Sequence, residues 1–458
     1  MSQTAGGSAT GQDPGQDPDP DPGPHTAQPT SDEPSERTSQ VARQIVALSL
    51  IAVLVGLLAG AGASAFIAVE HGLQEVLWHE LPEALGHDQA PAWLAVALLV
   101  IGALITHAGS LLPGNGGHRP LQGFGIDMGP RELAGVVVAA LGSLSFGAVL
   151  GPEAPLMAIG TALGALAFRD PSKPIRQIMM IVGAMSAVGA IFGNPLVTCI
   201  LMLEFAMLAG PRLANPVLLM PALAGLASGY VLQVGVGEWS GLGEAQLALP
   251  GLAPYAEVQL VDIATAVPLA VLVAVVVMGA RLVGQRVALR AAQAPLLTIV
   301  ASGVVIALCA IAVDAITGDG LDMVLFSGQS AMPNYLAVTS LGAALVILAG
   351  KFIGYSVSMG SGFRGGPIFP AVALGVIMST AATVVVTGTS TSALAATGIA
   401  AATAACMRMP FTALLLGVML TYPAGGATTV LAIVGVIVGL ASRLGGERLA
   451  PALQPAKP

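Results

Sequence analysis

Long stretches without a single charged residue dominate this sequence. No Asp, Glu, Lys or Arg occurs between Gly365 and Met407, and three further uncharged stretches cover Ile45–Val69, Ile263–Ala280 and Leu296–Val313. About 20 apolar residues in a row are enough for a helix to cross the hydrocarbon core of a bilayer. The sequence therefore predicts an all-α integral membrane protein that crosses the membrane several times.

Residues 1–40 have a different composition, rich in Asp, Pro and Gln. Such a segment buries too little apolar surface to offset its ordering entropy, so we expect a disordered acidic tail. It lacks the basic start, short apolar core and cleavage site of a signal peptide, which makes Ile45–Val69 the first span. Arg37 and Arg43 precede that span, and basic residues favour the cytoplasmic side. We therefore expect a multi-pass protein of the plasma (inner) membrane with both termini in the cytoplasm.

Glycine and proline reveal an internal repeat. The segment Gly151–Gly160 recurs 215 residues later as Gly366–Gly375, and Gly or Pro coincides at four positions. Chance matches are expected in a chain with 58 Gly and 32 Pro, but further pairs share this offset: Ser143 with Ser358, Gly147 with Gly362, and Pro195 with Pro410. The sequence thus predicts two inverted-topology repeats of tilted, partly broken transmembrane helices.

The repeat also predicts how the chain is divided. The expected parts are the tail over 1–40, a first transmembrane repeat over 41–240, a connecting loop over 241–254, a second transmembrane repeat over 255–446, and a short C-terminal tail over 447–458.

Both repeats carry the same helix-start motif, formed by Gly151 and Pro155 in the first and by Gly366 and Pro370 in the second. Proline is well tolerated in the first turn of a helix, where its missing N–H costs nothing. A helix start presents free N–H groups and about half a positive charge. Two such starts facing each other would attract a small anion and still release it, because neither carries a full positive charge.

Glu153 stands where the second repeat has Ile368. A carboxylate at a helix start can occupy the same electropositive point as a permeating anion, and protonation would release it. Glutamate near a helix start is also an ordinary stabiliser of the helix. A charged residue at membrane depth is costly, however, and usually marks a functional site. We therefore expect Glu153 to act as a gate and proton carrier.

Other chemistry finds little support in the sequence. Three cysteines lie in apolar segments without paired spacing, and six histidines show no metal-ligand spacing. We expect no metal site, no cofactor, no enzymatic activity and no nucleic-acid partner.

These motifs resemble the CLC family of chloride channels and chloride/proton antiporters. The family's Gly-Lys/Arg-Glu-Gly-Pro sequence is similar to Gly151–Pro155, and its Gly-x-Phe-x-Pro sequence is similar to Gly366–Pro370. Its Gly-Ser-Gly-Ile-Pro sequence loosely resembles Gly114–Pro120. The resemblance implies that Glu153 is the gating glutamate, that chloride or another small anion is the substrate, and that the chain forms homodimers in lipid.

The chain also departs from the family pattern. Asn115 stands at the serine position, beside Gly116, as a candidate anion-binding residue. Pro367 has no N–H, so Ile368 and Phe369 are the expected main-chain donors.

Two further departures concern the inner side of the pathway. No tyrosine follows Tyr422, although the family has one near the C-terminus. The family's second, inward-facing proton glutamate aligns with Phe205, next to Glu204. A one-residue shift turns a helical side chain by about 100°. Glu204 is therefore a candidate proton relay or a structural residue.

Three functions remain open at this point. The first is transport of small anions, most simply chloride, in exchange for protons carried by Glu153. The second is a passive anion channel gated by Glu153. The third is a broken-helix secondary transporter for a cation or a neutral solute, which would share the repeats and the helix interruptions.

Overall fold

The computed structural model describes residues 33–123, 125–168, 170, 174–209, 216–234 and 247–449. The chain divides into two units, residues 1–44 and 45–458. The main helices are α1 (Glu33–Glu75), α3 (Ala92–Ser110), α4 (Leu133–Leu144), α5 (Glu153–Leu166), α6 (Pro174–Phe192), α7 (Pro195–Ala209), α8 (Pro216–Val234), α9 (Leu260–Gln293), α10 (Pro295–Thr317), α12 (Leu341–Ser361), α13 (Ile368–Val385), α14 (Thr391–Met407), α15 (Pro410–Leu420) and α16 (Thr428–Leu449). Short helices are η1 (Val76–Glu80), α2 (Leu81–Ala84), η2 (Pro120–Gln122), η4 (Leu321–Met323), α11 (Met332–Leu336) and η5 (Tyr422–Ala424).

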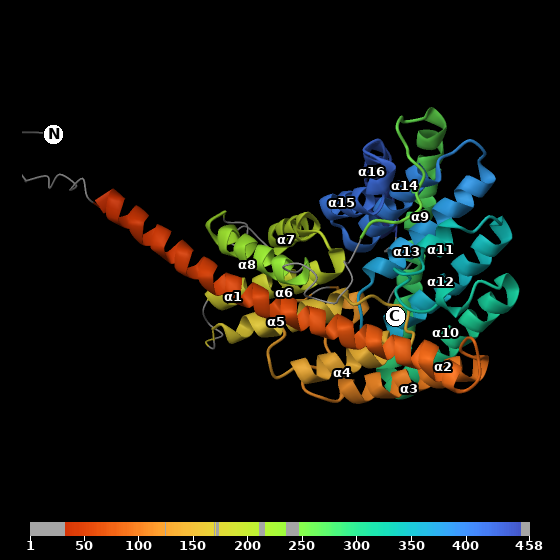
Figure 1. Ribbon diagram of the computed structural model, residues 1–458, viewed down its shortest axis with the longest axis horizontal. Coiled ribbons are helices and arrows are strands. Elements are labelled where there is room, and N and C mark those ends of the chain that lie inside the picture. Colours follow the sequence, from red (N-terminus) through yellow and green to blue (C-terminus); the bar gives the residue numbers. More distant parts are fainter. Residues whose placement is uncertain are drawn as a thin grey trace, which may run out of the picture. The chain divides into compact units, whose positions relative to one another are not determined.

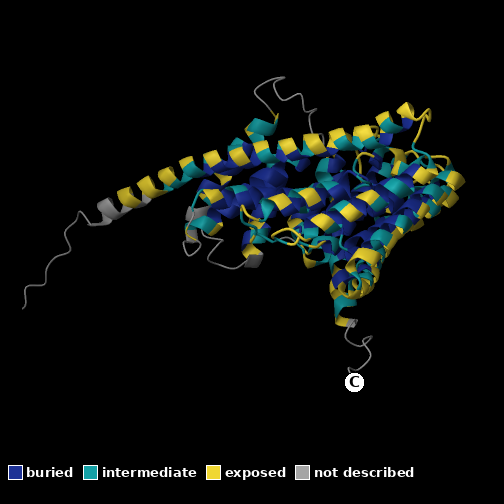
Figure 2. Ribbon diagram, turned by 90° about the horizontal axis from the view of Figure 1, so that it is seen from below, coloured by how far each residue is buried: buried dark blue, intermediate teal, exposed yellow. Residues whose placement is uncertain are grey.

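Eight helices among the described residues are long and apolar enough to cross a membrane. Shorter apolar helices, such as α5 and α15, accompany them. The outer faces of the helices are exposed, and the interior is buried (Figure 2). On α1 the exposed residues include Leu50, Leu54 and Leu58, which recur every four residues and suit contact with lipid. The prediction of an all-α, multi-span membrane protein is confirmed.

The predicted boundaries fall partly outside the described residues. Of the expected tail, residues 1–32 lie outside them, and α1 already begins at Glu33. Of the expected connecting loop, residues 241–246 lie outside them. At the C-terminal end α16 runs to Leu449, and residues 450–458 are not described.

Helix starts and helix breaks near the centre of the two repeats fall at the same repeat positions. Helix α5 starts at Glu153 and α13 at Ile368, 215 residues apart. The pairs α6/α7 and α14/α15 are interrupted at the same repeat position, directly before Pro195 and Pro410. Proline cannot continue a helix from its preceding turn without losing a hydrogen bond, which explains both interruptions. Figure 1 shows α14, α15 and α16 together beside α9, and α5, α6 and α8 together in the first repeat.

Hydrogen bonds between repeat-equivalent residues join the two halves. Gly151 and Gly366 form an antiparallel bridge, with N···O distances of 2.8 Å from Gly151 to Gly366 and 2.5 Å in return. Each partner in this pair is the repeat equivalent of the other. An arrangement that maps onto itself when the partners are exchanged has twofold symmetry, and its two chain segments run in opposite directions.

A second set of hydrogen bonds obeys the same symmetry. The N–H of Val149 donates to Ser358 Oγ over 3.1 Å, and the N–H of Arg364 donates to Ser143 Oγ over 2.8 Å. Residues 149 and 364 are repeat equivalents, as are the two serines. The two starts of α5 and α13 are therefore held face to face by main-chain and serine contacts.

Glycines bring the helices behind these starts into close contact. A Cβ atom at Gly160 of α5 would overlap the carbonyl of Gly183 in α6. In the second repeat a Cβ at Gly375 of α13 would overlap the carbonyl of Gly398 in α14. Small residues at such crossings let helix backbones approach closely, which stabilises helix pairs in lipid.

Candidate anion pathway

Glu153 is the first residue of α5, and its side chain is fully buried. The N–H of Phe369, in the first turn of α13, donates to Glu153 Oε1 over 3.0 Å. The N–H of Ile368 also interacts with this carboxyl group. The start of α13 thus directs its free main-chain donors at an acid that belongs to the start of α5.

Glycine is required at the point where the two starts meet. A Cβ atom added to Gly151 or to Gly366 would collide with the carboxyl group of Glu153. Pro367 caps α13 and contributes no N–H, so the donors come from the next two residues. Pro155 and Pro370 occupy the third position of their helices, where a missing N–H leaves no intrahelical bond unmade.

A tyrosine from α12 reaches the same region. The hydroxyl group of Tyr355 donates to the carbonyl oxygen of Pro367 over 2.8 Å, and Cys406 Sγ lies 3.6 Å from that oxygen. Tyr355 is buried and lies within electrostatic range of Glu153. The sequence indicated no tyrosine here, because Tyr355 lies far from the C-terminal position where the family pattern has one.

A cavity of about 840 Å³ extends to the residue that precedes Glu153. Pro152 and Leu150 form part of its wall. The polar residues that line it are Ser64, Glu70, His71, Gln74, Asn194, Tyr230, Gln233, Ser327, Gln329, Ser330 and Tyr422. A space of this size and polarity can hold water and small ions close to Glu153.

Glu70 of α1 is a second buried acid in this cavity. Its Oε1 accepts a hydrogen bond of 2.8 Å from Gln74 Nε2, and it interacts electrostatically with Glu153. Glu70 does not stand out in the sequence, because the uncharged stretch Ile45–Val69 ends directly before it. The signal that could have revealed it is the return of apolar residues at helical spacing beyond it, at Leu73, Val76 and Leu77.

Lys351 of α12 is a buried cation near the same cavity. Its Nζ donates to the carbonyl oxygens of Val324, Leu325 and Phe326 over 3.0, 2.9 and 3.1 Å. All three ammonium hydrogens thus have an acceptor. This contact fixes the segment that brings Phe326 to the cavity wall.

Asn115 and Gly116 contact an arginine from the second repeat. The guanidinium group of Arg364 donates to the carbonyl oxygen of Asn115 over 2.6 Å and to that of Gly116 over 3.1 Å. Asn115 has a φ of 52°, a left-handed conformation that asparagine tolerates better than most residues. The role of both residues in anion binding stays a prediction.

Glu204, in α7 of the first repeat, places its carboxylate at the start of α15 in the second repeat. Its carboxylate accepts from the N–H of Phe411 over 2.8 Å, from the N–H of Thr412 over 2.7 Å, and from Thr412 Oγ1 over 2.5 Å. These contacts are those of a helix cap, because they satisfy main-chain donors that have no partner within the helix. Of the two roles left open for Glu204, the geometry supports the structural one.

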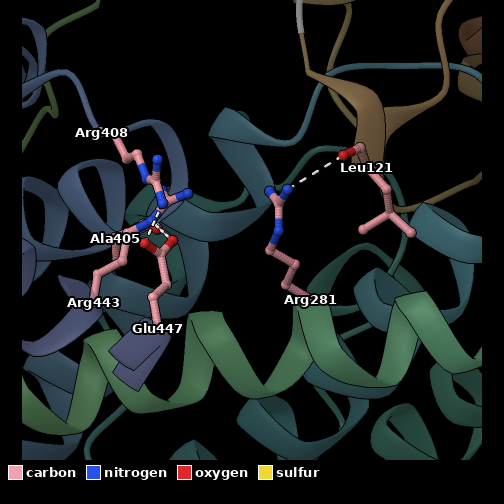
Figure 3. A network of polar contacts seen from close by, with 6 residues as sticks. All are labelled: Leu121, Arg281, Ala405, Arg408, Arg443 and Glu447. Atoms are coloured by element: carbon pink, nitrogen blue, oxygen red, sulfur yellow. Dashed lines mark hydrogen bonds and ion pairs between the residues drawn. The ribbon is translucent and has the colours of Figure 1, made fainter. Parts of the chain in front are cut away.

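Basic side chains gather close to Cys406. Arg281 and Arg443 lie within electrostatic range of this cysteine, and Arg443 Nη1 donates to Ala405 O over 2.6 Å. Figure 3 shows Arg408 and Arg443 around Glu447, and Arg281 directed at the carbonyl group of Leu121. Three arginines with one carboxylate leave a net positive charge, which favours anions.

Comparisons with known proteins agree with this fold. The family model described as voltage gated chloride channel matches residues 115–443. The structure of a slow cyanobacterial Cl⁻/H⁺ antiporter is similar with a TM-score of 0.71 and 18% identity, over 89% of this chain and 96% of that one. No curated protein matches the chain.

Two other solved structures share the fold. A CLC-type fluoride/proton antiporter is similar with a TM-score of 0.62 and 17% identity, over 87% of this chain and 96% of that one. A eukaryotic CLC transporter is similar with a TM-score of 0.64 and 15% identity, over 88% of this chain and 72% of that one. The family match covers more than half of the chain and includes both helix starts, so the chain belongs to the CLC family of anion transport proteins, which are not enzymes.

Proposed function

We propose that the chain exchanges a small anion, most simply chloride, for protons, and that Glu153 is both the gate and the proton carrier. The observation that carries this proposal is the hydrogen bond from the N–H of Phe369 to the buried carboxyl group of Glu153. A carboxylate there uses the donors that a permeating anion would need. The carboxylate of Glu153 and the permeating anion therefore compete for the same main-chain donors at the start of α13.

The competition supplies a mechanism. An ionised carboxyl group accepts strong hydrogen bonds from the start of α13, and it excludes the anion by occupying its place. When Glu153 takes up a proton it becomes a weaker acceptor, so an anion can displace it. Water in the cavity beside Pro152 can supply that proton, and the displaced side chain then gives it up on the opposite side of the gate. Anion entry and proton release are then alternating steps at one residue.

The identity of the anion is part of this proposal. The similar solved structures include a chloride/proton and a fluoride/proton antiporter. We assign chloride because the donors next to Glu153 are main-chain N–H groups at a helix start, which bind an anion without a full positive charge. Parallel measurements with chloride and fluoride test this choice.

A passive anion channel gated by Glu153 is the second candidate. The observation that favours it is the full engagement of Glu204 at the start of α15, which leaves this acid little freedom to relay protons. Family membership leaves the third candidate, a transporter for a cation or a neutral solute, without support.

Flux measurements in liposomes separate the two candidates. The purified chain is reconstituted, and anion efflux and proton uptake are recorded together for the parent and for Glu153→Gln. Glutamine keeps the size of the side chain but carries no exchangeable charge. For an antiporter we expect an outward pH gradient to drive anions uphill in the parent, and we expect Glu153→Gln to abolish proton movement while anion flux survives. An unchanged ratio of protons to anions in Glu153→Gln would contradict the role of this residue.

We further propose that the chain forms homodimers in the plasma (inner) membrane with both termini in the cytoplasm. Cross-linking in native membranes tests the dimer, and reporter fusions at each end test the orientation. A monomeric cross-linking pattern, or a reporter active outside the cytoplasm, would contradict these two points.

A further inference from the structure

Glu70 is held at the end of α1 against the connection between α4 and α5. Gln74 Nε2 donates to Leu144 O over 3.3 Å, and Ser145 Oγ donates to the carbonyl oxygen of Glu70 over 3.4 Å. One turn further on, Trp78 Nε1 donates to Ser145 O over 3.0 Å. These contacts attach the backbone around Glu70 to the segment that leads to Glu153. The position of this acid relative to the gate is therefore fixed by the fold.

The two carboxyl groups share an unusual feature. Oε2 of Glu70 and Oε2 of Glu153 are both buried, and neither has a hydrogen-bond partner among the described residues. An unpartnered buried oxygen is costly, and such an oxygen is satisfied when it takes up a proton that it can donate. Glu70 lines the cavity whose wall also includes Pro152, directly before Glu153. Glu70 therefore lines a polar space that reaches the residue next to Glu153.

The described part of the chain gives Glu70 no lysine or arginine partner in this space. The described lining residues of the cavity include neither Lys nor Arg. The titratable groups around it are His71 on its own helix, Tyr230 of α8, Tyr422 of η5, and Glu153, which interacts with it electrostatically. Two acids within range of each other disfavour a doubly charged state, so a proton on one favours the loss of a proton from the other.

We propose that Glu70 is a second proton-binding residue, placed in series with Glu153 on the cavity side of the gate. It accepts a proton from cavity water at Oε2 and passes it, directly or through that water, to Glu153, and Glu70 is then a carboxylate again. Glu70 thereby supplies the protons that release the gate. This inference rests on the proposed anion/proton exchange and names the residue that feeds it.

The test uses the same liposomes with Glu70→Gln and a matched control. The control is Glu75→Gln, which changes an exposed acid one turn and a half further along α1. For Glu70→Gln we expect proton and coupled anion movement to fall at least about tenfold, because a positioned proton-transfer group commonly contributes about a hundredfold and water can replace part of it. We also expect the pH profile of exchange to shift. Glu75→Gln should behave as the parent.

Repeating the Glu70→Gln substitution in the Glu153→Gln protein separates loss of proton supply from a structural effect of the substitution. In Glu153→Gln, where anions move without protons, adding Glu70→Gln should leave anion flux unchanged. An equal loss of anion flux in that background would overturn the inference, as would parent-like exchange in Glu70→Gln. If Glu70→Gln does not fold, Glu70→Asp keeps the acid but shortens its reach. We expect slower exchange with a displaced pH profile, and an unchanged profile would overturn the inference.

The same data distinguish failure of the inference from failure of the proposed function. If Glu153→Gln abolishes proton movement while Glu70→Gln changes nothing, only the role of Glu70 is wrong. If the parent moves no protons, both the exchange and the role of Glu70 are overturned.

Discussion

Two buried acids, Glu153 and Glu204, place their carboxyl groups at helix starts and differ in how many contacts hold them. Both oxygens of Glu204 accept hydrogen bonds from α15, whereas Glu153 Oε2 has no partner among the described residues. A side chain held through both oxygens stabilises one structure, because moving it breaks several charge-assisted bonds at once. A side chain held through one oxygen can leave at lower cost. The contrast supports the proposed movement of Glu153 and a structural role for Glu204.

Glu204→Gln should therefore lower stability and leave proton coupling as it is. The glutamine amide can accept at one oxygen only, so at least one of the N–H groups of Phe411 and Thr412 loses its partner. We expect a loss of about 1–3 kcal/mol, the usual cost of an unsatisfied buried group. The thermal midpoint of the detergent-solubilised protein measures it, with the exposed Glu257→Gln as control. A proton-to-anion ratio that falls in Glu204→Gln would contradict the structural role and restore the relay.

The sequence predicts some of these residues and misses others for a physical reason. Glu153, Ile368 and Phe369 could be found because a repeat places them at helix starts, and a local motif marks each start. Glu70 and Tyr355 carry no motif, and their importance arises only from contacts that the fold creates. Tyr355 reaches Pro367 within the same repeat, whereas Glu70 approaches Glu153 from a helix 83 residues earlier.

At the scale of helices, glycine positions determine how closely the elements pack. Gly160 in α5 and Gly375 in α13 are repeat equivalents, and each faces a glycine carbonyl of the next helix. The sequence predicted the starts and breaks of these helices from Gly and Pro. It did not predict which helices cross at these glycines, because Gly183 and Gly398 lie in stretches that are rich in small residues throughout.

Gly375→Val should force α13 and α14 apart. The new side chain would overlap the carbonyl group of Gly398, which belongs to the backbone and cannot rotate away. Overpacking of this kind costs about 1–3 kcal/mol. We expect a lower thermal midpoint and more aggregate in size-exclusion chromatography. The control is Gly445→Val in α16, where an added Cβ has no neighbour within 4 Å. Equal midpoints for the two variants would contradict the close crossing.

At the scale of the whole molecule, two inverted halves meet through bonds that occur in symmetric pairs. The bridge between Gly151 and Gly366 lies between the bonds of Ser143 and Ser358, and each serine satisfies a buried N–H of the opposite half. The sequence predicted two halves from the shared offset of these residues. It did not predict that equivalent residues would bind each other. The shared offset shows which residues are equivalent, but it does not show how close they lie in space.

The effects of the two serine contacts on stability should be coupled, because both contacts stabilise the same junction between the starts of α5 and α13. Ser143→Ala and Ser358→Ala each leave a buried N–H without its acceptor, at a cost of about 1–3 kcal/mol. A double-mutant cycle on the midpoint of denaturant-induced unfolding measures their interaction. Residues coupled through a shared backbone contact deviate from additivity by about 0.5 kcal/mol or more, and we expect a deviation of that size. The matched cycle pairs Ser358→Ala with Ser228→Ala, whose hydroxyl group donates to Val53 O between α8 and α1. That pair should be additive, and additivity in both cycles would mean that the two halves are joined by independent contacts.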